Sequence, residues 1–137
     1  MPESVSANFG YVTGKEVEDN AVAVLRYAEG ALGIVEAGFV NSHSPFSIEL
    51  HGTEGTLLYG FPDDVPVVRY NGGSGQWEKL ALEDRVPYAF SQWVEHIKQG
   101  TEASDNIAAA VDLTRLMEAS NRSVAEGRPI RIDELAE

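Results

Sequence analysis

The chain has 137 residues, of which 43% are hydrophobic, and 22 acidic against 10 basic residues give it a formal net charge of -12. This length suits one core, so a single domain over residues 1–137 is expected. Lys15 and Arg26 are the only basic residues among the first 68. Because nucleic acids and anionic membranes are bound by clustered cations, neither is an expected partner.

Cysteine is absent from the sequence, which excludes a disulfide framework and a thiolate metal site. The first residues, Met1-Pro-Glu, lack the basic start and apolar run of a signal peptide. No apolar run approaches the length of a membrane-spanning helix. A soluble, cytoplasmic protein is therefore expected.

The first 82 residues are rich in strand patterns. Two β-branched, apolar segments, residues 20–28 and 31–40, flank Glu29-Gly30, which predicts a hairpin with a two-residue loop and glycine at positive φ. Apolar and polar residues alternate over 46–51, and Thr56 to Tyr59 is expected to pair with that strand. Further strands are predicted at residues 5–12, 65–70 and 76–82, the last two around a glycine-rich loop.

Helix signals begin after Pro87. Apolar residues recur at helical spacing up to Gly100, and one face of this helix is expected to pack inward: Phe90, Trp93, Val94 and Ile97. A second helix, capped by Ser104 or Asp105, ends at Gly127 and has one apolar stripe: Ala110, Leu113, Met117 and Val124. Residues 130–132 are expected to return as a short edge strand.

These elements predict an α+β fold with an open, mainly antiparallel sheet and helices packed on one face. Both faces of the central hairpin are apolar, with Val22 and Val24 opposite Ala23 and Leu25. A strand with two apolar faces needs cover on both sides. Because two helices can cover only one face, the other face is expected to be an interface of a homodimer or a larger homo-oligomer.

The stretch Gly52-Thr-Glu-Gly55 has the glycines of a phosphate-binding loop. A Walker loop places lysine after its last glycine and then begins a helix. Here Thr56 follows Gly55, the next residues favour a strand, and Glu54 adds negative charge. A hairpin turn is the better interpretation of this stretch.

Four segments occur in an order and at spacings that resemble the C-terminal domain of the Gfo/Idh/MocA oxidoreductases. They are Tyr27-Ala-Glu-Gly-Ala-Leu-Gly33, Ile48-Glu-Leu-His-Gly-Thr-Glu-Gly-Thr-Leu58, Phe90-Ser-Gln-Trp-Val-Glu-His-Ile-Lys-Gln-Gly100 and Ala125-Glu-Gly-Arg-Pro-Ile130. In that family a Rossmann domain binds NAD or NADP, while the C-terminal domain shapes the substrate pocket and often the subunit interface. The resemblance implies a sugar, an inositol or a related polyhydroxy compound as the substrate of the whole enzyme.

The sequence lacks the Gly-x-Gly-x-x-Gly segment and the Glu-Lys-Pro segment of the family's N-terminal half. The family's Asp-x-x-x-His helix is also missing. We therefore expect a fragment of an NAD(P)-dependent dehydrogenase that lacks its Rossmann domain. By itself this chain is expected to bind no cofactor and to contain no catalytic residue.

Four residues are candidates for facing a small-molecule substrate. His43 lies in the loop Asn41-Ser-His-Ser-Pro45, where site residues tend to be presented, and Asn41 joins it by position. Tyr88 and Gln92 lie at the start of the helix predicted after Pro87, which the resemblance places near the substrate. His51 and His96 suit a half-exposed strand end and a solvated or interfacial helix position.

No metal site is expected, because the histidines lack the spacing of ligand pairs. The alternative to a dehydrogenase domain is a non-catalytic module that assembles subunits or binds a small molecule unaided. A phosphate-binding enzyme would rest on the glycines of Gly52 to Gly55 alone.

Overall fold

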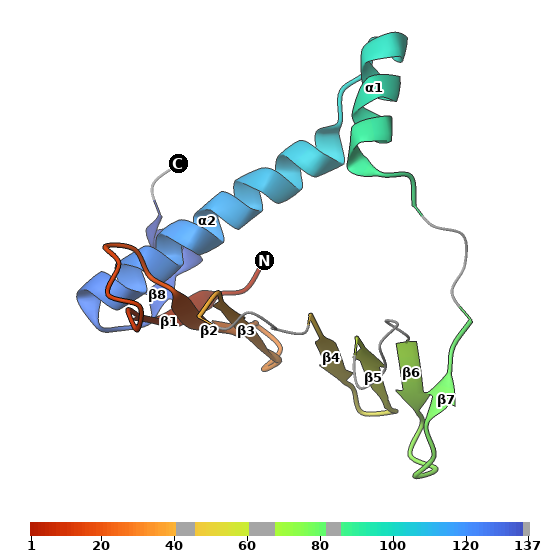
Figure 1. The fold of residues 1–137 in the computed structure, drawn as a ribbon, viewed down its shortest axis with the longest axis horizontal. Helices are drawn as coiled ribbons and strands as arrows, with labels where there is room; N and C mark the ends of the chain where they lie inside the picture. Colours follow the sequence, from red (N-terminus) through yellow and green to blue (C-terminus); the bar gives the residue numbers. More distant parts are fainter. Residues whose placement is uncertain (41–45, 61–67, 82–85, 136–137) are drawn as a thin grey trace. The chain divides into compact units, whose positions relative to one another are not determined.

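The computed structural model describes residues 1–40, 46–60, 68–81 and 86–135. The chain divides into two compact units, Met1–Ser42 with Ala89–Glu137, and His43–Tyr88, and each is considered by itself. Strands and helices are both present, and every strand pairing in the described residues is antiparallel (Figure 1). The predicted α+β class with an open antiparallel sheet is confirmed, whereas a single domain over residues 1–137 stays a prediction.

The first unit contains one sheet with four strands among its described residues. Its order is β3-β2-β1-β8, where β1 is Ser4–Gly10, β2 is Asn20–Arg26, β3 is Leu32–Gly38 and β8 is Ile130–Arg131. Strand β1 therefore pairs with β2 on one side and with the late strand β8 on the other. The predicted return of residues 130–132 is confirmed for the two residues of β8, after which the 3-10 helix η1, Ile132–Glu134, follows.

The hairpin of β2 and β3 forms as predicted, but its loop is one residue longer than predicted. The Tyr27 amide donates to the Ala31 carbonyl at 3.0 Å, so Ala28, Glu29 and Gly30 form the loop. The Gly30 amide donates back to the Tyr27 carbonyl at 3.0 Å, and Gly30 has a φ of 85°. Three-residue loops of this kind end in a residue at positive φ, which explains why glycine follows Glu29.

Two helices follow, α1 over Ala89–Gln99 and α2 over Ser104–Glu126. The expected capping of α2 by Ser104 or Asp105 is wrong, because the N-cap is Ala103 and no side chain caps it. Ser104 and Asp105 are instead the first two helical residues. The predicted end at Gly127 is confirmed, since this residue is left-handed with φ 64° and its amide donates to Ser123.

Helix α2 packs on the face of the sheet that carries Val5, with Ala119 and Ile130 completing a fully buried cluster. Leu116 packs against this cluster. The stripe predicted for this helix is wrong, because Leu113 and Met117 are exposed. Small residues at 119 and 123 let the helix approach the strands closely, while Leu113 and Met117 lie on another part of its surface.

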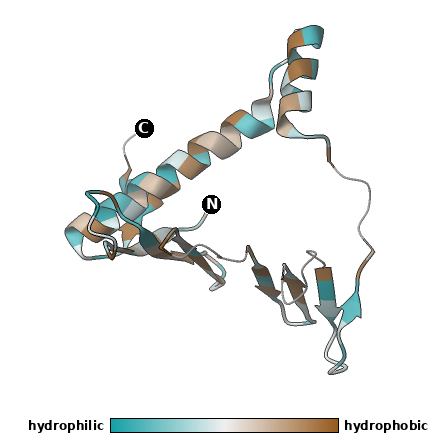
Figure 2. Cartoon of the chain, in the orientation of Figure 1, coloured by the Kyte–Doolittle hydropathy of each residue, from teal (hydrophilic) through white to brown (hydrophobic). Residues whose placement is uncertain are grey.

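Helix α1 carries the apolar residues that the pattern indicated, yet they are not packed inward in the described structure. Phe90, Trp93 and Ile97 are all exposed, and no residue of α1 is buried. Figure 2 shows hydrophobic positions along this helix. The 3.6-residue period of the apolar residues therefore predicted the helix correctly. The prediction that its apolar face packs inward is not met in the described residues.

The second unit contains a sheet of order β4-β5-β6-β7 in its described part. The strands are β4, Ile48–His51, β5, Thr56–Tyr59, β6, Val68–Asn71, and β7, Glu78–Lys79. The sequence pattern placed all four: β5 has the predicted limits, β4 and β7 are shorter than predicted, and β6 ends one residue later than predicted. Of the strand predicted at 65–70, residues 65–67 lie outside the described residues. Of the strand predicted at 76–82, residue 82 does.

The Gly-Thr-Glu-Gly stretch is a hairpin turn, as interpreted. The Gly52 amide donates to the Gly55 carbonyl at 2.9 Å, and His51 pairs with Thr56. Gly55 is required for space, because a Cβ there would lie 2.5 Å from the ring of Tyr70. The Tyr70 hydroxyl also donates to the Glu54 carbonyl at 3.3 Å, so a residue of β6 fixes this turn.

Candidate functional site

The four predicted substrate-facing residues can be followed only in part. Asn41 and His43 lie outside the described residues. Tyr88 directly precedes α1 and is 73% exposed, while Gln92, in the first turn of α1, is half-buried. Both remain candidates for contact with a ligand.

The two described histidines make local polar contacts. Nε2 of His51 lies 3.4 Å from a carboxylate oxygen of Glu49, and its Nδ1 lies 3.4 Å from the Thr56 hydroxyl. In α1, His96 Nδ1 lies 2.9 Å from the hydroxyl of Thr101, just beyond the end of the helix. His51 is therefore an exposed strand residue, and His96 fixes the turn that follows α1.

Metal ligation is not indicated by the part of the chain that the structure describes. No group of three or more histidine, aspartate or glutamate side chains there could hold an ion.

The sheet face opposite α2 in the first unit is open and partly apolar. On this face, Val24 of β2 lies between its two paired residues, Ile34 of β3 and Ser6 of β1. Ile34 is 73% exposed, and Val22 and Leu32 are exposed beside it. These apolar side chains form a continuous patch on β2 and β3, which we call the open sheet face. Exposed apolar patches of this kind are uncommon on soluble monomers.

The loop between β1 and β2 is organised by Asp19, which is 1% exposed. Its carboxylate accepts the amides of Thr13 at 2.6 Å and Val12 at 3.0 Å, and also the side-chain amide of Asn20 at 2.9 Å. The Thr13 amide, followed by that of Val12, lowers the pKa of Asp19 to about 2. Asp19 is therefore an ionised structural anchor, and the sequence pattern did not single it out.

A second ionic cluster joins the end of α2 to the 3-10 helix. Arg128 donates to both carboxylate oxygens of Glu134, at 3.1 and 2.7 Å, and the Arg131 amide donates to the same carboxylate at 3.0 Å. Arg128, followed by the Arg131 amide, lowers the pKa of Glu134 to about 2. These partners are all satisfied within the cluster, so it holds the last turn of the chain in place.

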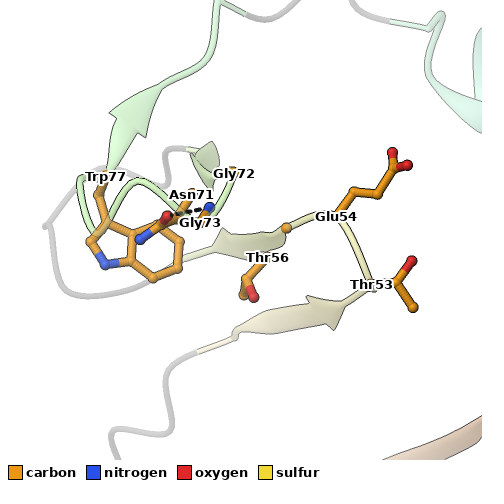
Figure 3. Close-up of a pocket in the computed structure, with 9 residues that line it drawn as sticks. Thr53, Glu54, Thr56, Asn71, Gly72, Gly73 and Trp77 are labelled. Carbon is orange, nitrogen blue, oxygen red and sulfur yellow. Dashed lines mark hydrogen bonds between the residues drawn. The ribbon is translucent and has the colours of Figure 1, made fainter.

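The second unit contains a hollow of about 480 Å³ between two turns (Figure 3). Its lining consists of nine residues: Gly52, Thr53, Glu54, Gly55, Thr56, Asn71, Gly72, Gly73 and Trp77. Figure 3 shows Trp77 and Asn71 on one side, Thr53 and Glu54 on the other, and Thr56 between them. Trp77 is 46% exposed here. Pattern analysis missed this hollow, because its walls come from turns far apart in sequence.

Helices of the described chain are all too short or too polar to span a membrane.

The fold is shared with solved oxidoreductase structures. An oxidoreductase from Agrobacterium radiobacter, in complex with NAD+, L-tartaric acid and magnesium, matches 98% of the chain with a TM-score of 0.74 and 22% identity. An aldose-aldose oxidoreductase from Caulobacter crescentus, complexed with glycerol, matches 95% with a TM-score of 0.73 and 21% identity. A levoglucosan dehydrogenase, in complex with NADH and levoglucosan, matches 97% with a TM-score of 0.71 and 18% identity. In fold, the chain is thus an α+β domain of the kind found in these proteins.

A family model matches the first part of the chain. The GFO/IDH/MocA C-terminal domain matches residues 1–58, which include β1, the β2–β3 hairpin and most of the β4–β5 hairpin. The resemblance to the C-terminal domain of the Gfo/Idh/MocA oxidoreductases is thereby confirmed.

The chain spans less than half of each of these solved structures, covering 44%, 41% and 45% of their lengths. None of the curated proteins matches the sequence significantly.

Proposed function

We propose that this chain is the substrate-shaping C-terminal domain of an NAD- or NADP-dependent oxidoreductase that acts on a sugar, an inositol or a related polyhydroxy compound. The observation that carries the proposal is the match of nearly the whole chain to less than half of oxidoreductase structures that contain NAD+ or NADH. Hydride transfer needs a nucleotide cradle, which this proposal assigns to a separate Rossmann domain. The chain alone is not catalytic under this proposal.

The proposed substrate class is supported by the ligands of two similar structures. The Caulobacter crescentus protein is complexed with glycerol, and the levoglucosan dehydrogenase with levoglucosan. Both ligands carry several hydroxyl groups and no charge. Tyr88 and Gln92 are the proposed contacts from the described part of this chain, and Asn41 and His43 are proposed as further contacts.

Self-association through the open sheet face belongs to the same proposal. Val24 and Ile34 are exposed there, opposite the face that α2 covers. A two-fold axis would place this face against its own copy, and a stable interface of this kind buries about 1,200 Å² or more in total. The domain would then supply both the pocket wall and the subunit contact, and it would act in the cytoplasm.

The experiment that tests the proposed function starts from the gene region that precedes codon 1. Its translation, in frame or as a neighbouring reading frame, is expected to encode a Rossmann domain. The reconstituted protein should form NADH or NADPH when incubated with a panel of sugars and inositols. The proposal is wrong if that region encodes no nucleotide-binding domain and the chain is expressed by itself. The alternative, a non-catalytic module that assembles subunits or binds a small molecule, would then be the better interpretation.

A further inference from the structure

We propose that the hollow lined by the turns at 52–55 and 71–73 binds a neutral polyhydroxy compound of about one sugar ring, stacked on Trp77. This inference does not depend on the proposed function. All nine lining residues belong to the unit His43–Tyr88, so the walls need no other domain. The ligand is expected to bind to the chain as it stands.

The two turns that form the walls are held together before any ligand arrives. Tyr70 projects from β6, its hydroxyl donates to the carbonyl of Glu54, and its ring lies against Gly55 and Gly72. A Cβ at Gly55 or Gly72 would come within 2.5 or 2.9 Å of Tyr70 atoms. Tyr70 does not itself line the hollow, but it holds the two turns in place, so little ordering is needed when a ligand enters.

The second wall is shaped by Asn71, whose side-chain oxygen accepts the amide of Gly73 at 2.9 Å. This bond fixes the amide group and leaves its Nδ2 atom as a donor. The hydroxyl of Thr56, 3.4 Å from His51 Nδ1, can both donate and accept. Together they offer the polar groups that orient hydroxyl-bearing ligands.

Trp77 supplies the apolar part of the hollow. The residue is 46% exposed, although large aromatic side chains gain most free energy when they are covered. The face of a sugar ring carries C–H groups that cover an aromatic ring while its hydroxyls point to the rim. A hollow of about 480 Å³ falls within the usual range for small-molecule sites.

The charge of the hollow selects a neutral ligand. None of its nine described lining residues is basic, and Glu54 is its single charged side chain. A phosphate group would need a cation or a helix N-terminus, and the turn leads into strand β5 instead. With a chain charge of -12, an anion would also be repelled at long range.

Intrinsic fluorescence gives a direct test, because Trp77 and Trp93 are the two tryptophans of the chain. In the Trp93→Phe variant, emission comes from Trp77 alone. Titration with D-glucose to ~100 mM should give a saturable blue shift, since weak sugar sites have millimolar dissociation constants. Amide NMR shifts of Gly72 and Gly73 in the unsubstituted chain provide a second readout.

Thr56→Val in the same background should weaken glucose binding about threefold or more, because one hydroxyl partner is lost. Thr114→Val makes the same change on the exposed surface of α2 and should leave the affinity unaltered. The proposal is overturned if neither readout responds to glucose, if Thr56→Val and Thr114→Val behave alike, or if sodium phosphate saturates the same signals more tightly than glucose.

Discussion

The hydroxyl of Ser123 in α2 accepts the backbone amide of Ala7 in β1 at 3.0 Å, so a helix side chain satisfies a strand amide beyond the end of β8. The same hydroxyl donates to the Arg128 carbonyl at 2.8 Å. Strand β8 pairs only with Ser4 and Val5, and Ser123 serves the next outward-pointing amide of β1. Ser123 thus connects the sheet, the helix and the turn after the helix.

Replacing Ser123 with alanine should destabilise the first unit by about 1–3 kcal/mol, because the buried Ala7 amide loses its acceptor. Urea unfolding monitored by circular dichroism measures the change. Ser120→Ala is the matched control, since the Ser120 hydroxyl only bonds back to the Leu116 carbonyl within α2. Equal effects of the two substitutions would show that the contact with Ala7 contributes nothing.

Acid should loosen the β1–β2 loop through Asp19. Its pKa is about 2 in the folded chain against an ordinary value of 3.8, so the unfolded state binds more protons between these values. The stabilisation is therefore complete above about pH 4 and is lost as the pH falls toward 2. Urea midpoints measured between pH 6 and pH 2 should drop across this window.

The variant Asp19→Asn separates this effect from that of Glu134, whose pKa is also lowered to about 2. It should have a lower urea midpoint than the unsubstituted chain at pH 6, and a smaller further loss on acidification. A pH profile parallel to that of the unsubstituted chain would mean that Asp19 does not cause the acid response.

Self-association should depend on the open sheet face. At micromolar concentration the chain is expected to sediment as a dimer or larger, and Ile34→Asp or Val24→Asp should raise the dissociation constant at least about tenfold by burying a charge. Val86→Asp, an equally drastic change at an exposed position of the other unit, is the control. A clean 14.9 kDa species from the unsubstituted chain would refute this prediction.

Cofactor binding by the chain alone is expected to be undetectable. The described helices do not follow a glycine turn of the dinucleotide-binding kind, and the net charge of -12 repels the pyrophosphate. Calorimetric titration with NAD and with NADP should show no binding heat. A micromolar dissociation constant for either cofactor would require a nucleotide site that is complete within this chain.

Tyr88 and Gln92 should affect the substrate more than the cofactor once the domain is joined to a Rossmann domain. Alanine at either position is expected to raise KM for the polyhydroxy substrate about tenfold, the loss of roughly one good contact, with a smaller change in KM for NAD or NADP. Glu95→Ala, on the exposed surface of α1, is the control. Unchanged kinetics in both variants would remove these residues from the site.

Local patterns predicted the strands well, because alternation and turn residues act over a few positions. The β2–β3 hairpin was found in this way, and its loop was misjudged by one residue because Ala28 carries no turn signal. Helix α2 shows the limit of such patterns. Its larger apolar residues suggested one stripe, whereas the sheet contacts the side with Ala119 and Ser123. The side of a helix that packs on a sheet depends on how closely the helix and the sheet can approach, which the apolar pattern alone does not show.

The candidate site was less predictable than the fold. Trp77 and Gly55 belong to different turns, and they line one hollow because β6 pairs with both β5 and β7. Asp19 carried a weak signal, an acid directly before a strand and after a glycine-containing loop, which pattern analysis passed over. Asn41 and His43 came from loop position and resemblance, and they stay predictions.

The pairing of Val5 with Ile130 also sets an order of events in folding. These residues stand almost at opposite ends of the sequence, so closing the core around them carries a large loop entropy and a high contact order. During synthesis the β1–β2–β3 meander and the whole of His43–Tyr88 leave the ribosome long before Ile130 does. Until Ile130 is made, Val5 therefore lacks part of its cover, although β1 is made before the other strands of its sheet.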